Sequence, residues 1–250
     1  MVHIMDKMDD LPQPNGDDRK VGPFRFFELM DRSGWMFVWA GFLSLITLLP
    51  FIGSVALAWQ NRSLLVLLIG GMLGGGLAAP FLCGLIDVLL CCLRDEPHFL
   101  WHRYRTSIGR NWKASLPFGI LYGAVFAIQL FTLLHLPYSD SGLGLLICQV
   151  VSMIVSTSLL LHSIPQIVLM KLSAAAVLKN SVLMSIRYFP KTLLAVLIQG
   201  IYWAAVVLFF PMSSIVILFT SLWLPTLLDL TVLYPSLDEA FQIEERLHES

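Results

Sequence analysis

The stretch Ser63–Leu93, SLLVLLIGGMLGGGLAAPFLCGLIDVLLCCL, decides the fold class, because it contains only one charged residue, Asp87. A helix needs about 20 apolar residues to cross the hydrocarbon core, where every backbone polar group must be hydrogen-bonded. This run is longer than one straight span requires, and glycines and Pro80 interrupt it. We therefore expect a transmembrane helix that is tilted, kinked near Pro80 or partly re-entrant.

Other stretches share this composition, so the sequence predicts an all-α polytopic membrane bundle of six transmembrane helices. The expected spans are approximately 35–59, 63–93, 114–136, 144–170, 192–210 and 213–234. The chain is 57% hydrophobic and 13% charged, and 13% is about half the charged fraction of a soluble domain. We expect 1–22 to be a disordered cytoplasmic tail, 23–241 the transmembrane domain and 242–250 a second cytoplasmic tail.

Basic residues predict the orientation of the spans. The Lys and Arg residues fall in the N-terminal tail, in the segments 94–113 and 171–191, and in the C-terminal tail, with the exception of Arg62. The positive-inside rule therefore predicts a multi-pass protein of the cell membrane with both termini in the cytoplasm. A net charge of −1 argues against a nucleic-acid partner.

The cytoplasmic segments are expected to form amphipathic helices in the headgroup region. From 99 to 112, apolar residues recur every four positions while bases turn to other faces, and similar segments precede the first and fifth spans. The bases there could recruit anionic lipids, although the positive-inside rule alone also explains them. The interfacial basic and aromatic residues are Arg32, Trp35, Arg103, Arg105, Arg110, Trp112, Lys113, Arg187 and Lys191.

Three ionisable residues within the expected spans are candidates for function, because polar groups are costly in hydrocarbon. Asp87, His162 and Asp229 lie at similar depths, about 10 to 14 Å from the cytoplasmic ends of their helices at 1.5 Å per residue. They could form one polar cluster that opens to the cytoplasm. Alternatively, each pairs with Ser, Thr, Gln or backbone groups of a neighbouring helix, or reaches the membrane interface unaided.

No catalytic motif accompanies these three residues, so we expect no enzymatic activity. The cysteines lack the spacing of a zinc site or of a disulfide framework, and neither a metal nor a cofactor is expected.

Two overlapping GxxxG pairs, Gly70/Gly74 and Gly71/Gly75, allow close approach of helix backbones. We expect them to pack within the bundle, with homodimerisation as the alternative.

Four stretches resemble the YesL-like family of bacterial membrane proteins, whose biochemical activity is unknown. They are GPFRFFELMDRSGWMFVWAGFLSLITLLP (22–50), LLCCLRDEP (89–97), FLWHRYRTSIGRNWKASLPFG (99–119) and LKNSVLMSIRYFPKTLLAV (178–196). The resemblance implies an accessory or transport-related role in carbohydrate uptake, with sugar-transporter components as partners. The family has no established catalytic residues to carry over.

The alternative function is a membrane scaffold or interaction protein. In that case the basic interfacial helices would dock lipids or a partner protein.

Overall fold

The computed structural model describes residues 23–96, 99–135, 142–170 and 172–242, and these residues form helices with no β-strand among them. The tail expected at 1–22, and all but the first residue of the tail expected at 242–250, lie outside the described residues. The helices are α2 (Pro23–Ile46), α3 (Leu49–Asn61), α4 (Leu64–Leu93), α5 (Leu100–His135), α6 (Gly142–Leu169), α7 (Ala174–Arg187), α8 (Phe189–Leu208), α9 (Ser213–Thr220) and α10 (Trp223–Phe241).

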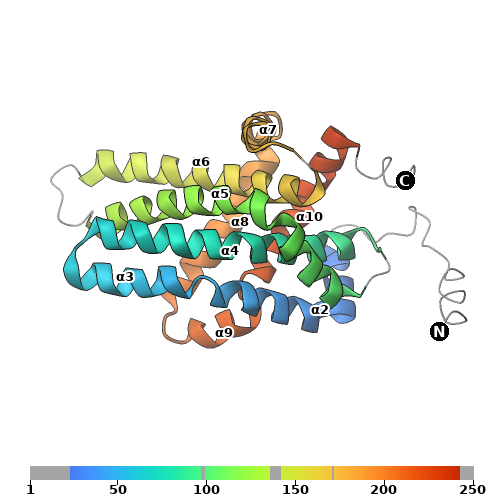
Figure 1. Cartoon of the computed structure of the whole chain (residues 1–250), viewed down its shortest axis with the longest axis horizontal. Helices are drawn as coiled ribbons and strands as arrows, with labels where there is room; N and C mark the ends of the chain where they lie inside the picture. The colour runs from blue at the N-terminus through green and yellow to red at the C-terminus, as the bar shows by residue number, and fades with distance from the viewer. Residues whose placement is uncertain (1–22, 97–98, 136–141, 171, 243–250) are drawn as a thin grey trace, which may run out of the picture. The chain divides into compact units, whose positions relative to one another are not determined.

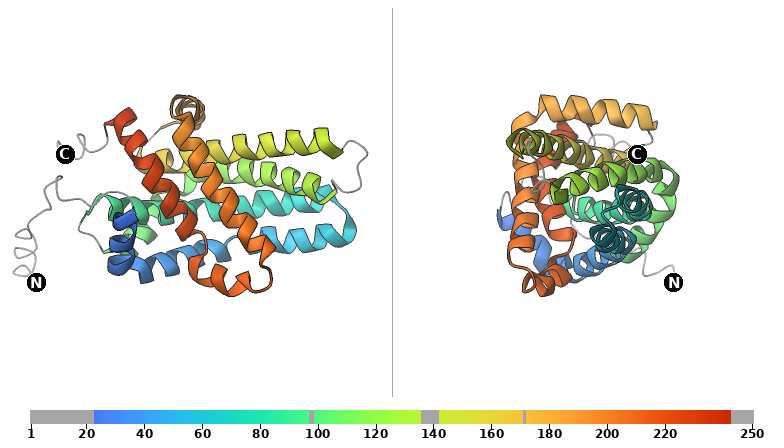
Figure 2. Two further views of the ribbon diagram at one scale, coloured as in Figure 1. Left: turned by 180° about the vertical axis from the view of Figure 1, so that it is seen from behind. Right: turned by 90° about the vertical axis from the view of Figure 1, so that its left-hand side faces the viewer.

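The chain divides into two compact units, Met1–Gly34 and Trp35–Ser250. The first contributes the start of α2, and the second contains every site described below. Within the second unit α4 packs against α3, α5, α6 and α10, and α8 packs against α10 (Figures 1 and 2). Helix α7 lies crosswise to α5 and α6 (Figure 1).

The apolar surface of these helices is typical of a membrane protein. Helices α4, α5, α6 and α8 are long and apolar enough to cross a bilayer, and two bent helix pairs would bring the number of spans to six. Outward-facing side chains include Ile201, Val207 and Ile215, each at least 69% exposed. Exposed apolar surface on this scale is unfavourable in water and favourable in lipid.

Glycines bring α4 into close contact with helices on two sides. Gly71 and Gly75 lie against Gly119 and Gly123 of α5, and a Cβ atom added to Gly71 would lie 2.5 Å from the Gly123 carbonyl oxygen. A β-carbon on either partner would force the helices apart. The spacing of Gly119 and Gly123 is itself a GxxxG pair.

The other face of the glycine stretch contacts α3. A Cβ on Gly74 would lie 2.7 Å from the Phe51 Cβ, and one on Gly70 would overlap the Ser54 side chain. All four predicted glycines therefore pack within the bundle. Helix α4 runs as one helix through Pro80, so the re-entrant alternative is wrong.

The basic segment before the third span is not a separate interfacial helix. It is the first part of α5, a helix of 36 residues. At 1.5 Å per residue α5 is about 54 Å long, well beyond the roughly 30 Å hydrocarbon core. Tyr104, Ser107 and Asn111 are buried in the bundle. Because the segment packs against other helices, it stays in line with the rest of α5. The repeat of apolar residues does not reveal this packing.

The two outermost predicted spans are bent helix pairs. The span expected at 35–59 is α2 and α3, which meet at 44° just before Pro50, where proline disfavours a continuous helix. The span expected at 213–234 is α9 and α10, which meet at 55°. The break there includes Ser221, which has a φ of 34°, a backbone conformation that side-chain-bearing residues seldom adopt.

Candidate functional site

Asp87 is clamped by two arginines of α5. Arg103 donates from Nε to Asp87 Oδ1 over 2.9 Å, and Arg110 donates from Nη2 to Asp87 Oδ2 over 3.2 Å. The arginines are seven residues apart and so share one face of the helix. Arg103 also pairs with Glu96. Because the Asp87 side chain is only 4% exposed, it acts here as an ion-paired link between α4 and α5.

His162 of α6 is fully buried, and its ring bonds to α8. Its Nε2 lies 2.9 Å from Thr192 Oγ1, which in turn donates to the Tyr188 carbonyl oxygen. Because the Thr192 proton goes to Tyr188, we assign the proton of the His162–Thr192 bond to Nε2. His162 Nδ1 is then an acceptor, and it is buried with no hydrogen-bond partner in the described part of the chain.

Gln166 lies one turn after His162 and is equally buried. Its Nε2 donates to the His162 carbonyl oxygen over 3.0 Å and to Ser181 Oγ over 3.3 Å, but its Oε1 has no partner among the residues that the structure describes. A buried acceptor without a donor costs about 1–3 kcal/mol. The two acceptors are spaced i and i+4 on one helix and lie in the bundle interior, and neither residue is among those that line the groove described below.

Hydroxyl groups extend this polar network to α5 and α7. Ser163 Oγ lies 3.0 Å from Ser181 Oγ and 3.0 Å from Tyr122 Oη. The chain of bonds therefore runs from Tyr122 on α5 through Ser163 on α6 and Ser181 on α7 to the Gln166 amide. All of its side chains are neutral hydrogen-bonding groups.

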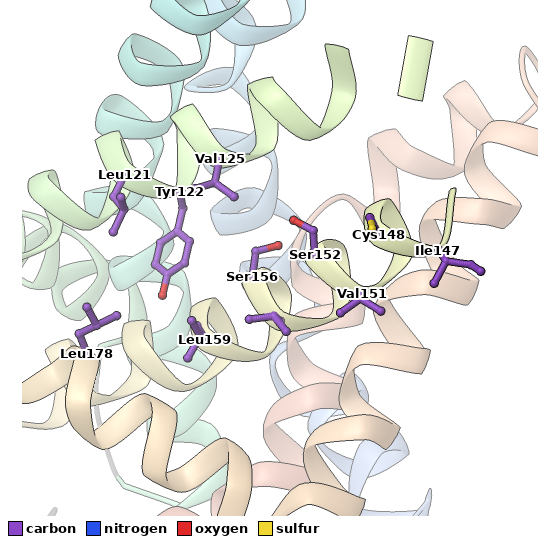
Figure 3. A pocket seen from close by; sticks show the side chains of 11 residues that line it. Leu121, Tyr122, Val125, Ile147, Cys148, Val151, Ser152, Ser156, Leu159 and Leu178 are labelled. Carbon is purple, nitrogen blue, oxygen red and sulfur yellow. The ribbon is translucent and has the colours of Figure 1, made fainter. Parts of the chain in front are cut away.

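Tyr122 also lines an apolar groove of about 560 Å³ between α5, α6 and α7. Figure 3 shows Tyr122 projecting from α5 toward Leu159 of α6 and Leu178 of α7. The groove walls are aliphatic apart from a few hydroxyls and Cys148. The polar network thus begins at the wall of a groove that would suit an apolar chain.

Asp229 of α10 has its own partner on α8. Gln199 donates from Nε2 to Asp229 Oδ2, and Trp203 donates from Nε1 to Gln199 Oε1 over 3.0 Å. The other carboxyl oxygen, Oδ1, is buried, and none of the described residues bonds to it. Asp229 is therefore held by a neutral amide.

The three candidate residues have separate partners among the described residues. Asp87 pairs with arginines, His162 with Thr192 and Asp229 with Gln199, and none of the three bonds to another. His162 and Asp229 each pair with a polar side chain of a neighbouring helix, as the alternative prediction stated. The arginines that hold Asp87 come from the segment expected in the headgroup region, so Asp87 lies level with that segment.

The interfacial residues divide by location. Arg103 and Arg110 hold Asp87, Lys113 lines a pocket described below, and Arg105 and Trp112 are exposed. Near α8, the side chains of Arg187 and Lys191 lie over the Tyr188 ring, 5.3 and 5.8 Å from its centroid.

The remaining two interfacial residues lie on α2. Trp35 packs edge-on against Trp39, with ring centroids 5.8 Å apart, and Arg32 belongs to the first unit.

Sequence reasoning missed the residues that build the polar network. Gln166, Ser163, Ser181 and Gln199 carry no charge, so a search for ionisable residues passes over them. The available signal was a Gln or Tyr within an apolar run, since such groups in hydrocarbon require partners. No group of His, Cys, Asp or Glu that could hold a metal occurs in the described part of the chain.

Comparisons with protein-family models, curated proteins and solved structures find no match to this chain, so nothing among them identifies a YesL-like family.

Proposed function

We propose that this protein is an accessory or transport-related membrane component of carbohydrate uptake, and that it acts without catalysis. The observation that carries the proposal is the pair of buried acceptors, His162 Nδ1 and Gln166 Oε1, for which the described residues provide no donor. Sugar hydroxyls are donors, and a buried acceptor gains most from the donor it lacks. The resemblance of four stretches to YesL-like proteins points to the same role.

The groups around these acceptors suit a neutral, polyhydroxylated ligand. Tyr122 offers a hydroxyl that can donate or accept. Ser163 and Ser181 donate their protons to backbone carbonyls and so offer acceptor lone pairs, and Gln166 offers an amide. Charged groups would favour an ionic solute instead. Ion pairs occur elsewhere in the molecule, around Asp87 and between Arg187 and Glu239.

Equilibrium binding and uptake in proteoliposomes test the proposal, with labelled glucose, maltose and xylobiose as probes. The full chain is expected to bind or accumulate at least one of them. Gln166→Met removes the orphan acceptor and is expected to weaken binding about tenfold, as the loss of one well-placed hydrogen bond would.

Gln129→Met provides the matched control. Gln129 is a buried amide of α5 that bonds to Ser152 and Ser156 of α6, away from His162 and Gln166. Sugar binding should survive this change. Absence of binding and uptake for every probe, or equal loss in both variants, contradicts the proposal.

The orientation and the number of crossings are part of the same proposal. If each bent pair crosses once, the chain crosses six times and its termini share one side of the membrane. The basic segments then lie in the cytoplasm. Single cysteines at Lys113 and Lys179 are expected to be labelled from the same side, and labelling from opposite sides would refute this topology.

A further inference from the structure

A second cavity, of about 660 Å³, lies between α5, the end of α6 and the start of α7. Arg110, Asn111 and Lys113 of α5 form part of its lining, together with Ser173 and Ala174 at the start of α7. Much of the remaining lining is apolar. A cavity with bases at one side and apolar walls elsewhere fits an amphiphile.

The charges at this cavity are positive overall. Arg110, which belongs to the ion-paired set around Asp87, brings one positive charge to the lining. Lys113 adds a second, and it has no ion-pair partner among the described residues. Arg110 uses Nη2 for Asp87, and its side chain is 52% exposed, so other guanidinium N–H groups remain available.

Two further groups are suited to an anion. Asn111 is 5% exposed and donates to Ser107 through Nδ2, which leaves a second N–H of that amide free to donate. Ser173 caps α7 by accepting from the Ala176 N–H. The N–H groups before Ala176 have no helical carbonyl, and the helix dipole adds partial positive charge at this end.

The basic cavity and the apolar groove have lining residues that lie one turn apart on α5. Pro117 and Phe118 line the cavity, and Leu121 and Tyr122, one turn later, line the groove. On α7, Val177 lines the basic cavity and the next residue, Leu178, lines the apolar groove. Lys113 to Val125 covers about 18 Å along a helix, close to the roughly 15 Å of one leaflet's hydrocarbon.

We propose that these two cavities form one binding site for an anionic phospholipid. The phosphate lies at Arg110, Asn111, Lys113 and the start of α7, and an acyl chain lies in the groove between α5 and α6. Charge complementarity and the matched length select a lipid over a second copy of this chain. The proposal does not depend on the role in carbohydrate uptake.

Native mass spectrometry of the full chain in dodecyl maltoside tests the site by titration with phosphatidylglycerol and with phosphatidylcholine. Each base near a membrane surface contributes roughly a fivefold gain in affinity for an anionic lipid. Phosphatidylglycerol is therefore expected to bind at least about tenfold more tightly than phosphatidylcholine, and Lys113→Gln to weaken it about fivefold. Arg105→Gln, an exposed base of the same helix outside the cavity, should leave it unchanged.

A second pair of variants tests the acyl-chain half of the site. Val151→Phe should fill the groove and weaken both lipids, whereas Val150→Phe, also exposed but outside the groove, should not. Equal affinity for the two lipids, or equal loss in the Lys113 and Arg105 variants, would overturn the proposal. Displacement of lipid by millimolar inorganic phosphate would indicate a site for free anions instead, and a lipid-free dimer would assign the groove to a second copy.

Discussion

Replacement of Gly75 by alanine tests the close contact between α4 and α5. A Cβ at this position would lie 2.9 Å from the Gly123 Cα and 3.2 Å from the Gly119 carbonyl carbon. Carbon atoms pack best at about 3.5–4.0 Å, so the helix backbones must separate by roughly 0.5 Å or more. Both contacts are with backbone atoms, which cannot rotate away as a flexible side chain would.

Overpacking of this kind costs about 1–3 kcal/mol, and alanine returns up to about 1 kcal/mol through its higher helix propensity. We therefore expect Gly75→Ala to lower the free energy of unfolding by about 1–2 kcal/mol. Gly109→Ala is the matched control, because an added Cβ there would meet nothing within 4 Å. The control should raise stability by about 0.5–1 kcal/mol.

Unfolding by SDS in mixed micelles with dodecyl maltoside, followed by circular dichroism, measures this difference. The two variants should differ by about 1.5–3 kcal/mol. Equal stability of Gly75→Ala and Gly109→Ala would refute the idea that α4 and α5 depend on their glycines for close packing.

Three further substitutions separate the roles of the charged groups, with stability measured in the same micelles. Asp87→Asn should lower stability by about 2 kcal/mol, less than the 3–5 kcal/mol of a fully buried pair, because Arg103 keeps its bond to Glu96. Arg187→Gln should change it by less than about 0.5 kcal/mol, since this arginine lies 3.7 Å from Glu239 and both side chains are exposed; a larger loss would contradict that reasoning. Asp229→Asn should cost less than about 1 kcal/mol, because only a neutral amide holds this carboxyl; a loss above 2 kcal/mol would imply an ionic partner.

The helical, apolar character of the chain could be predicted because it depends on composition alone. Runs such as 63–93 contain almost no charge, and only helices satisfy their backbone within so short a stretch of lipid. The packing role of the α4 glycines was also predictable from their spacing. The sequence could not predict which glycines contact α3 and which contact α5, because that depends on which helices lie on each side of α4.

The failures have a common physical cause. Periodicity showed that the segment 99–112 is amphipathic, but it could not tell whether its buried face meets lipid headgroups or protein. Tyr104 and Asn111 pack into the bundle, and α5 continues without a break. Likewise, the sequence gives only the distance of Asp87 from the end of its own helix. Its partners depend on the register of α4 against α5, which the sequence does not show.

The dependence of Asp87 on Arg103 and Arg110 has a consequence for biosynthesis. When α4 leaves the ribosome, the arginines that neutralise its carboxylate have not yet been made. An aspartate raises the cost of insertion by about 2.5–3.5 kcal/mol at the centre of a helix and by less near the end, where Asp87 lies, six residues before Leu93. We therefore expect α4 and α5 to leave the translocon together as a hairpin, with the ion pairs formed before either helix meets lipid.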